Sequence, residues 1–277
     1  MSKVKKESTE VVDVKANIPT TIFGMDISQL ESDAGQGSQN VSAQDMATPI
    51  ISILQSNSPQ CKKSDGKYIK GATEGMLFNN VTGEVYDGES GIMVVPCFFE
   101  KVFIEWKPNR GGLAGIHDAN TPLRDQVTMV KDAEGKESPT LPNGNALIET
   151  NQHYVLLLNE QGFEPAVIAM SSSALKSSRT WNTLIKRVTL SNGKGGVFNP
   201  ASFYMAYKLS TIARTKDNYS WFGWNIEPQG PVATMDLYNA GAALSKAVAA
   251  GAVKVKQEQV DGGPASVIDN EEAIPFD

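Results

Sequence analysis

The sequence predicts an α+β protein built mainly on an antiparallel β-sheet, curled or closed into a small barrel, with helices attached. Three observations lead to this class. Runs rich in β-branched and aromatic residues recur between residues 76 and 227. Only two longer segments, 173–188 and 232–250, have helical character. Both ends of the chain are polar and poor in aromatic residues, so we expect flexible termini around one compact core.

The N-terminal segment, residues 1–45, contains a single aromatic residue, Phe23. It buries too little apolar surface to offset the entropy cost of ordering, so we expect it to be flexible. Order is expected to begin near Thr48 and Pro49, which match a helix N-cap followed by proline at the first helical position. A short buried strand is the alternative there. The chain thus divides into a flexible segment (1–45), a β-rich core (46–256) and a C-terminal tail (257–277).

The core should begin with strands. Residues 76–89 predict a β-hairpin that turns at Thr82-Gly83, and the apolar run 91–106 predicts a long strand in which Pro96 must lie at an edge, a bulge or a break. Gly, Pro, Asn and Asp dominate residues 107–145, which predicts a long loop. Further strands are expected at 146–150, 153–160, 164–170, 203–214 and 219–227.

Charge is unevenly distributed along a chain whose formal net charge is −6. Residues 257–277 contain six acidic residues and no basic residue. Residues 165–225 contain eight basic residues and one acidic residue, which gives 8 − 1 = +7. This asymmetry indicates a polyanionic partner and a tail that competes for the same surface. The alternative is an ordinary solvated surface that happens to be basic.

The helix expected over 173–188 is amphipathic. At 100° per residue, one arc of about 100° carries four cations and no acid: Lys176, Arg179, Lys186 and Arg187. The opposite arc is apolar and includes Trp181, for which we expect a place in the core rather than in base stacking. The helix therefore predicts a core-facing stripe and a cationic outer face.

Two aromatic strands are expected after this helix, and alternation assigns their side chains to faces. Tyr204 and Lys208 should form an exposed aromatic–basic pair on the first strand. On the second, Tyr219 and Trp221 should face outward beside Gly223, where the missing side chain lets a ligand approach the backbone. Rings that stack on bases and cations that contact phosphates are typical of single-stranded nucleic-acid binding. An ordinary aromatic core is the alternative.

These patterns give a set of candidate DNA-binding residues. It combines the cations and outward rings of the second half with Trp106 and the three cations that flank it. The set is Lys101, Trp106, Lys107, Arg110, Lys176, Arg179, Lys186, Arg187, Lys194, Tyr204, Lys208, Arg214, Lys216, Tyr219 and Trp221. We expect them to line one continuous trough. Lys194 lies in the glycine-rich segment 191–196, which does not match a P-loop but suits a flexible phosphate-contacting loop.

Other classes of protein are disfavoured. Cys61, Cys97, His117 and His153 are too few and too widely spaced for a disulfide framework or a zinc site, so we expect a reduced, intracellular protein without metal or cofactor. No apolar run is long enough to span a membrane. The sequence lacks the serine-hydrolase, zinc-protease and dinucleotide-binding motifs, so an enzyme is not expected.

The end of the tail, Asp-Asn-Glu-Glu-Ala-Ile-Pro-Phe-Asp, resembles the C-terminal tip of bacterial and phage single-stranded DNA-binding proteins. This resemblance implies an OB-like nucleic-acid-binding domain ahead of a tail that docks on replication, repair and recombination proteins. The residues that match the tip are Asp269, Glu271, Glu272, Ile274, Pro275 and Phe276. One departure is Asp277, because the family usually ends on the phenylalanine.

The sequence therefore predicts a non-enzymatic single-stranded DNA-binding protein of phage-type DNA replication or recombination, acting in the host cytoplasm and compatible with homo-oligomers. Two alternatives stay open. One is a phage virion or scaffold-associated structural protein, and the other is a recombinase that anneals complementary strands. Preference for DNA over RNA is also open.

Deleting residues 257–277 should tighten binding to oligonucleotides at low salt. A tethered acidic segment has a high local concentration beside the basic surface and shields it until DNA displaces it. Affinity measured for the full-length and truncated proteins across salt concentrations checks this. Unchanged or weaker binding by the truncated protein would contradict self-shielding.

Overall fold

The computed structural model describes residues 21–22, 25–41, 46–108, 111–131, 137–160, 162–216 and 219–253. Contacts divide the chain into two compact units, Met1–Ser42 and Ala43–Asp277. In the first unit, β1 (Thr21–Ile22) pairs antiparallel with β2 (Met25–Asp26), and α1 (Ile27–Ser32) follows directly. The carboxylate of Asp26 caps α1 by accepting from the backbone N–H of Ser28 at 2.9 Å.

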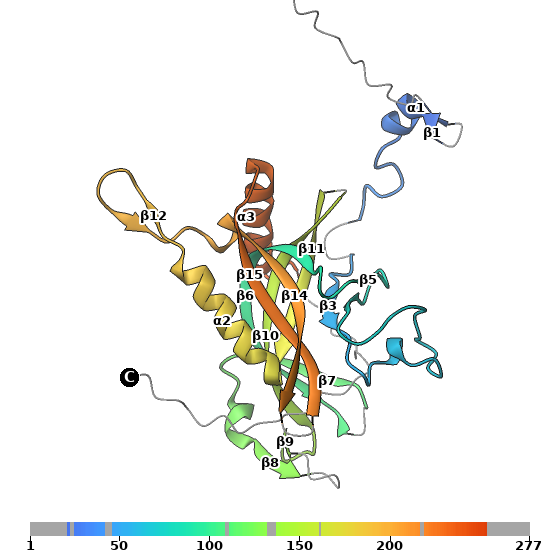
Figure 1. Ribbon diagram of the computed structural model, residues 1–277, viewed down its shortest axis with the longest axis vertical. Helices are drawn as coiled ribbons and strands as arrows, with labels where there is room; N and C mark the ends of the chain where they lie inside the picture. The colour runs from blue at the N-terminus through green and yellow to red at the C-terminus, as the bar shows by residue number, and fades with distance from the viewer. Residues whose placement is uncertain are drawn as a thin grey trace, which may run out of the picture. The chain divides into compact units, whose positions relative to one another are not determined.

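The second unit is built on one curled sheet (Figure 1). Its main path runs in the order β15-β14-β6-β10-β11-β3-β4-β5. The bounds are β3 (Ile50–Ile53), β4 (Leu77–Asn79), β5 (Val85–Tyr86), β6 (Ile92–Trp106), β10 (Ala146–Asn159), β11 (Gly162–Ser171), β14 (Met205–Lys216) and β15 (Tyr219–Pro231). Neighbours on this path are antiparallel except β3 and β11, which are parallel. The predicted class, α+β with a curled antiparallel sheet, is confirmed.

Several sequence-based details hold in this sheet. The β4–β5 pair is the hairpin expected around Thr82-Gly83. Pro96 lies at a bulge, because the register between β6 and β10 shifts where Tyr154 pairs with Phe98 and Val155 with Pro96. Two expectations were wrong. The segment after Pro49 forms the strand β3, the alternative that the sequence left open, rather than a helix, and 146–159 forms one continuous strand instead of two.

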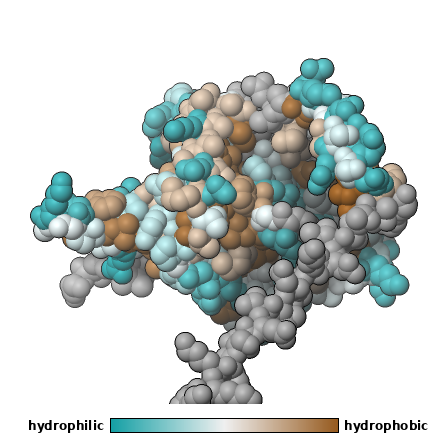
Figure 2. Space-filling view, turned by 90° about the horizontal axis from the view of Figure 1, so that it is seen from above, coloured by the Kyte–Doolittle hydropathy of each residue, from teal (hydrophilic) through white to brown (hydrophobic). Residues whose placement is uncertain are grey.

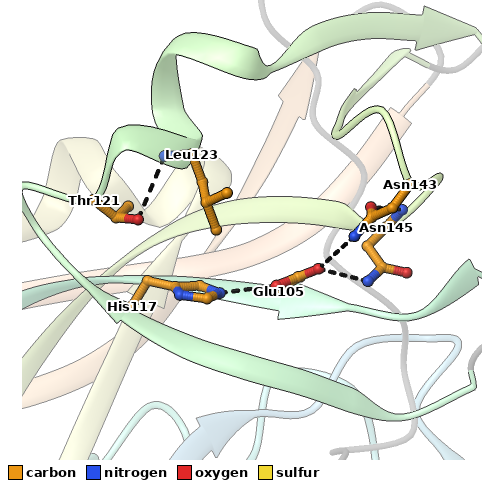
Figure 3. A network of polar contacts seen from close by, with 6 residues as sticks. All are labelled: Glu105, His117, Thr121, Leu123, Asn143 and Asn145. Carbon is orange, nitrogen blue, oxygen red and sulfur yellow. Dashed lines mark hydrogen bonds and ion pairs between the residues drawn. The ribbon is translucent and has the colours of Figure 1, made fainter.

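The expected long loop at 107–145 is largely structured. It forms β7 (Leu113–Asp118), a 3-10 helix (Pro122–Gln126), β8 (Thr128–Lys131) and β9 (Glu137–Thr140). The largely buried carboxylate of Glu105 ties β7 and the turn at 143–145 to β6 (Figure 3). Its Oε2 lies 2.8 Å from Nε2 of His117, and its Oε1 accepts from the side-chain amides of Asn143 at 3.0 Å and Asn145 at 2.5 Å. The hydrogen bonds from Asn145 and Asn143 hold the pKa of Glu105 below its usual value.

The 3-10 helix closes a small apolar cluster beside this network. Thr121 caps it by accepting from the N–H of Leu123 (Figure 3), and Leu123 packs against the cluster of Phe103, Leu141 and Leu147. Residues 107–145, although loop-like in composition, therefore contribute to a small folded region. It combines this apolar cluster with the hydrogen-bond network of Glu105.

The concave face of the sheet holds α2 (Leu175–Arg187). Trp181 is fully buried in a core that includes Val155, Ile168 and Leu209. Its ring stacks on His153 with centroids 4.5 Å apart and meets Tyr207 edge-on at 5.9 Å. The amphipathic helix and the core position of Trp181 are as the sequence predicts, and the four cations of the helix are exposed.

The opposite face of the sheet is covered by α3 (Met235–Ala249), the second predicted helix. Leu237, Leu244 and Val248 pack there with Val95, Cys97 and Leu156 from the sheet, among others. The hydroxyl of Thr234 caps α3 by accepting from the N–H of Leu237 at 3.2 Å. Each face of the curled sheet thus carries one helix.

A polar cluster lies beneath α2 inside the concave core. Nε2 of His153 lies 2.8 Å from the hydroxyl of Ser178, which also accepts from the side-chain amide of Asn151 at 2.9 Å. His153 is 1% exposed. Burial lowers the pKa of His153 to about 3, so the imidazole stays neutral at physiological pH.

His153→Gln should flatten the loss of stability on acidification. A histidine with a lowered folded-state pKa protonates more readily when unfolded, so its contribution is present above pH ~6.5 and lost as the pH falls toward the folded value. Between pH 7 and 5 the wild type should lose about 2 kcal/mol of unfolding free energy more than the glutamine variant. Urea denaturation at both pH values measures this difference. Equal losses would show that His153 titrates normally in the folded protein.

Candidate functional site

A groove of about 850 Å³ runs between β15, the segment that follows β3, and the beginning of α2. It is lined by residues 52–58, 169, 171–177, 179, 214–216 and 219–224. The two walls come from opposite ends of the main sheet path, where β15 lies at one end and β3 lies near the other. The groove therefore occupies the place where the curled sheet approaches itself.

The sheet is closed at this place by side chains and loops instead of a strand ladder. β3 ends at Ile53, and two residues later the amide of Gln55 accepts from the N–H of Phe222 at 2.9 Å and donates to its C=O at 2.8 Å. In a second hydrogen bond, the hydroxyl of Thr211 donates to the C=O of Gly75 at 2.6 Å. Gln55 thus reproduces one rung of a β-ladder and leaves the space around it open.

Among the described residues that line the groove, four are cations and none is Asp or Glu. Lys176 and Arg179 come from the first turns of α2, and Arg214 and Lys216 come from the end of β14. All four side chains are exposed. Residues 38 positions apart in sequence, Lys176 and Arg214, therefore contribute to one positive surface.

Two of the predicted aromatic residues line the same groove. Tyr219 is 61% exposed, and Trp221 is half-buried. Trp224 lies deeper, at 4% exposure, and its C=O accepts from the hydroxyl of Ser177 at 3.2 Å, which fixes α2 against β15. The groove thus offers rings in its wall and cations at exposed positions.

Gly223 does not provide the open approach expected from the sequence. The side chain of Arg214 lies across it, so that a Cβ at residue 223 would be 2.5 Å from Nε of the arginine. Nη2 of Arg214 also donates to the C=O of Trp224 at 3.3 Å. The space left by the missing side chain of Gly223 is therefore occupied by the side chain of Arg214. This contact helps to fix the position of the guanidinium.

Tyr204 is outside the groove lining, because the chain from Ser202 to Tyr204 forms a 3-10 helix and β14 begins only at Met205. The side chain of Tyr204 is half-buried. Phe203, next to it, packs beneath α3 against Tyr238, and a Cβ at Gly241 would lie 2.6 Å from the Cβ of Phe203. The expected alternation holds only after Met205, and Lys208 is half-buried and outside the lining.

The proposed extension around Trp106 is not part of the groove. Lys101 lies on β6, with its ammonium 2.8 Å from the carboxylate of Glu149, so its charge is matched. Trp106, at the end of β6, and Lys107 are also absent from the lining. Arg110 lies outside the described residues. The structure therefore does not bring Lys101, Trp106 and Lys107 into the groove with the other candidates.

The remaining cations occupy the far end of α2. Lys186 and Arg187 lie in its last turn, and Lys194 lies in the following β-hairpin. The tail residues Asp269, Glu271, Glu272, Ile274, Pro275 and Phe276 lie outside the described residues.

Sequence reasoning missed the polar residues of the groove. Besides Gln55, the lining includes the run Ser171–Ser173 between β11 and α2. Ser172 has φ of +50°, the one positive value for a non-glycine residue among the described positions. Its hydroxyl oxygen is buried and has no hydrogen-bond partner among them. The signal available in the sequence was a triple serine at a strand-to-helix junction.

Two other kinds of site receive no support from the described residues. They contain no group of three or more His, Cys, Asp or Glu side chains that could hold a metal ion. None of the helices found there is both long enough and apolar enough to cross a membrane.

Comparison with known proteins places the chain in a family. No curated protein and no solved structure matches it. A family model described as Pam3 phage gp34-like protein matches residues 20–254, which is most of the chain and includes every residue of the groove. The chain therefore belongs to the Pam3 phage gp34-like protein family.

Proposed function

We propose that this protein binds single-stranded DNA during phage DNA replication or recombination and catalyses no reaction itself. The observation that carries the proposal is the groove, in which four cations and two accessible aromatic rings meet and the described lining residues include no carboxylate. Membership of a phage family supports the viral setting.

The chemistry of the groove suits an unpaired strand. Cations at exposed positions can contact successive phosphates, and rings such as Trp221 and Tyr219 can stack on bases whatever their sequence. A volume of about 850 Å³ lies in the range of pockets that enclose small ligands, so it accommodates a few nucleotides rather than a duplex. Aromatic contacts with bases also require that the bases are unpaired.

Binding of oligo(dT) should quench tryptophan fluorescence and weaken steeply with salt. Each phosphate neutralised on a single strand contributes about −0.7 to the slope of log K against log[salt], so the four groove cations predict a slope of about −3. Titrations at several salt concentrations measure both quantities. A flat salt response with unquenched emission would reject the proposal.

Lys216→Glu should weaken oligo(dT) binding several-fold at low salt and reduce the magnitude of the salt slope by about 0.7, the contribution of one phosphate. The residue is exposed, so the substitution should not affect folding. Lys107→Glu is the matched control, because it makes the same charge change at an exposed residue outside the groove. Equal losses in the two variants would show that net charge, rather than the groove, controls binding.

A competition gel shift with single- and double-stranded DNA tests the preference for unpaired strands. The proposal expects that excess duplex leaves the single-strand complex intact. Failure to bind either form would overturn it and favour a structural role in the virion.

A further inference from the structure

The cationic surface continues beyond the groove along α2. The helix carries Lys176 and Arg179 at the groove and ends with Lys186 and Arg187 in its last turn. Its 13 residues span about 20 Å. From Pro165 to Lys216 the sequence has no Asp or Glu, so no acid interrupts this surface from within the segment.

A hairpin projects directly after this helix (Figure 1), formed by β12 (Leu190–Ser191) and β13 (Val197–Phe198). We call residues 190–198 the arm. Its turn is held by Asn192, whose side-chain oxygen accepts from the N–H of Lys194 at 2.9 Å and of Gly196 at 3.0 Å. These hydrogen bonds give the turn a defined conformation.

The base of the arm is tied to the end of α2. The side-chain amide of Asn199 donates to the C=O of Lys186 at 2.7 Å and to the C=O of Val188 at 2.9 Å. These bonds satisfy carbonyls that a helix end leaves without partners. They also fix the arm relative to the cationic face of the helix.

The arm exposes a combination of apolar and cationic side chains. Val197 is 76% exposed and Phe198 is 48% exposed, and Lys194 at the turn is also exposed. In Figure 2 the arm is the projection at the left, where hydrophilic and hydrophobic residues lie side by side. An exposed ring among cations repeats the chemistry of the groove at a second place.

We propose that the arm is a second contact for the same DNA strand. A strand leaving the groove follows the exposed face of α2, places phosphates on Lys186, Arg187 and Lys194, and stacks a base on Phe198. This inference rests on the proposed function and adds the residues of the arm to the binding site. The length of α2, about 20 Å, leaves room for several nucleotides beyond the groove.

A DNA strand fits this surface better than a second copy of the chain does. Two copies that meet through this surface would bring like charges together. The apolar part of the arm that is exposed consists mainly of two side chains, far less than the roughly 1,200 Å² that a stable protein interface buries. A polyanion matches the cations and needs only a ring on which to stack.

The test compares oligo(dT) of about three nucleotides, the few that the groove accommodates, with oligo(dT) of about 20 nucleotides, which is long enough to reach the arm. Phe198→Ala should weaken binding of the long oligonucleotide about tenfold, the effect expected for one lost base stack, and leave the short one unchanged. Phe198→Tyr should restore the long-strand affinity because it keeps a stacking ring. Phe163→Ala is the matched control, since Phe163 is 43% exposed and lies outside both the groove and the arm.

The outcomes separate this inference from the proposed function. If the wild type binds both lengths and Phe198→Ala binds the long oligonucleotide normally, the arm is not a DNA contact while the groove proposal stands. If Phe198→Ala instead changes the oligomeric state in sedimentation without a length-dependent loss of affinity, the arm joins protein copies and the inference is overturned. If the wild type binds neither length, the proposed function itself fails.

Discussion

The burial of Trp181 between the sheet and α2 is the interaction on which the surface of this protein depends. The indole stacks on His153 and meets Tyr207 edge-on, and both partners are nearly inaccessible. A large ring in one position fixes the rotation of the helix about its own axis. With the indole inward, the arc that carries Lys176 and Arg179 must face solvent.

The incomplete closure of the sheet is the second constraint. A barrel closed by a full ladder would leave no room between its first and last strands, whereas here the amide of Gln55 supplies one rung opposite Phe222. The space left around that rung is the groove, and α2 forms its third wall. The fold and the groove are therefore linked, because the residues that join the two ends of the curled sheet also line the groove.

The sequence predicts those parts of the structure that depend on local periodicity. The cationic and apolar arcs of α2 follow from spacing alone, and the sequence predicts strands close to β14 and β15. For Pro96 the sequence leaves an edge, a bulge or a break open, and the structure shows the bulge. Composition misled where tertiary contacts decide. The Gly- and Pro-rich stretch after Trp106 is held in place by hydrogen bonds between Glu105 and a histidine and two asparagines that are distant in sequence. A local sequence pattern cannot predict such contacts.

The candidate site shows the same division. Alternation identifies Tyr219 and Trp221 as accessible, but it cannot place Tyr204, whose segment departs from strand geometry before β14 begins. Equally, nothing in the spacing distinguishes Lys216, which reaches the groove, from Lys101, whose charge is matched by Glu149. Such distinctions depend on which elements approach one another in three dimensions.

The contact between Arg214 and Gly223 means that the electrostatic potential of the groove is controlled from an uncharged position. A methyl group at residue 223 would collide with the guanidinium and swing it aside, which moves a positive charge while the formal charge of the protein stays the same. Substitutions at residue 223 in relatives would then change ligand affinity. A comparison that counts only lysines and arginines would not detect this change.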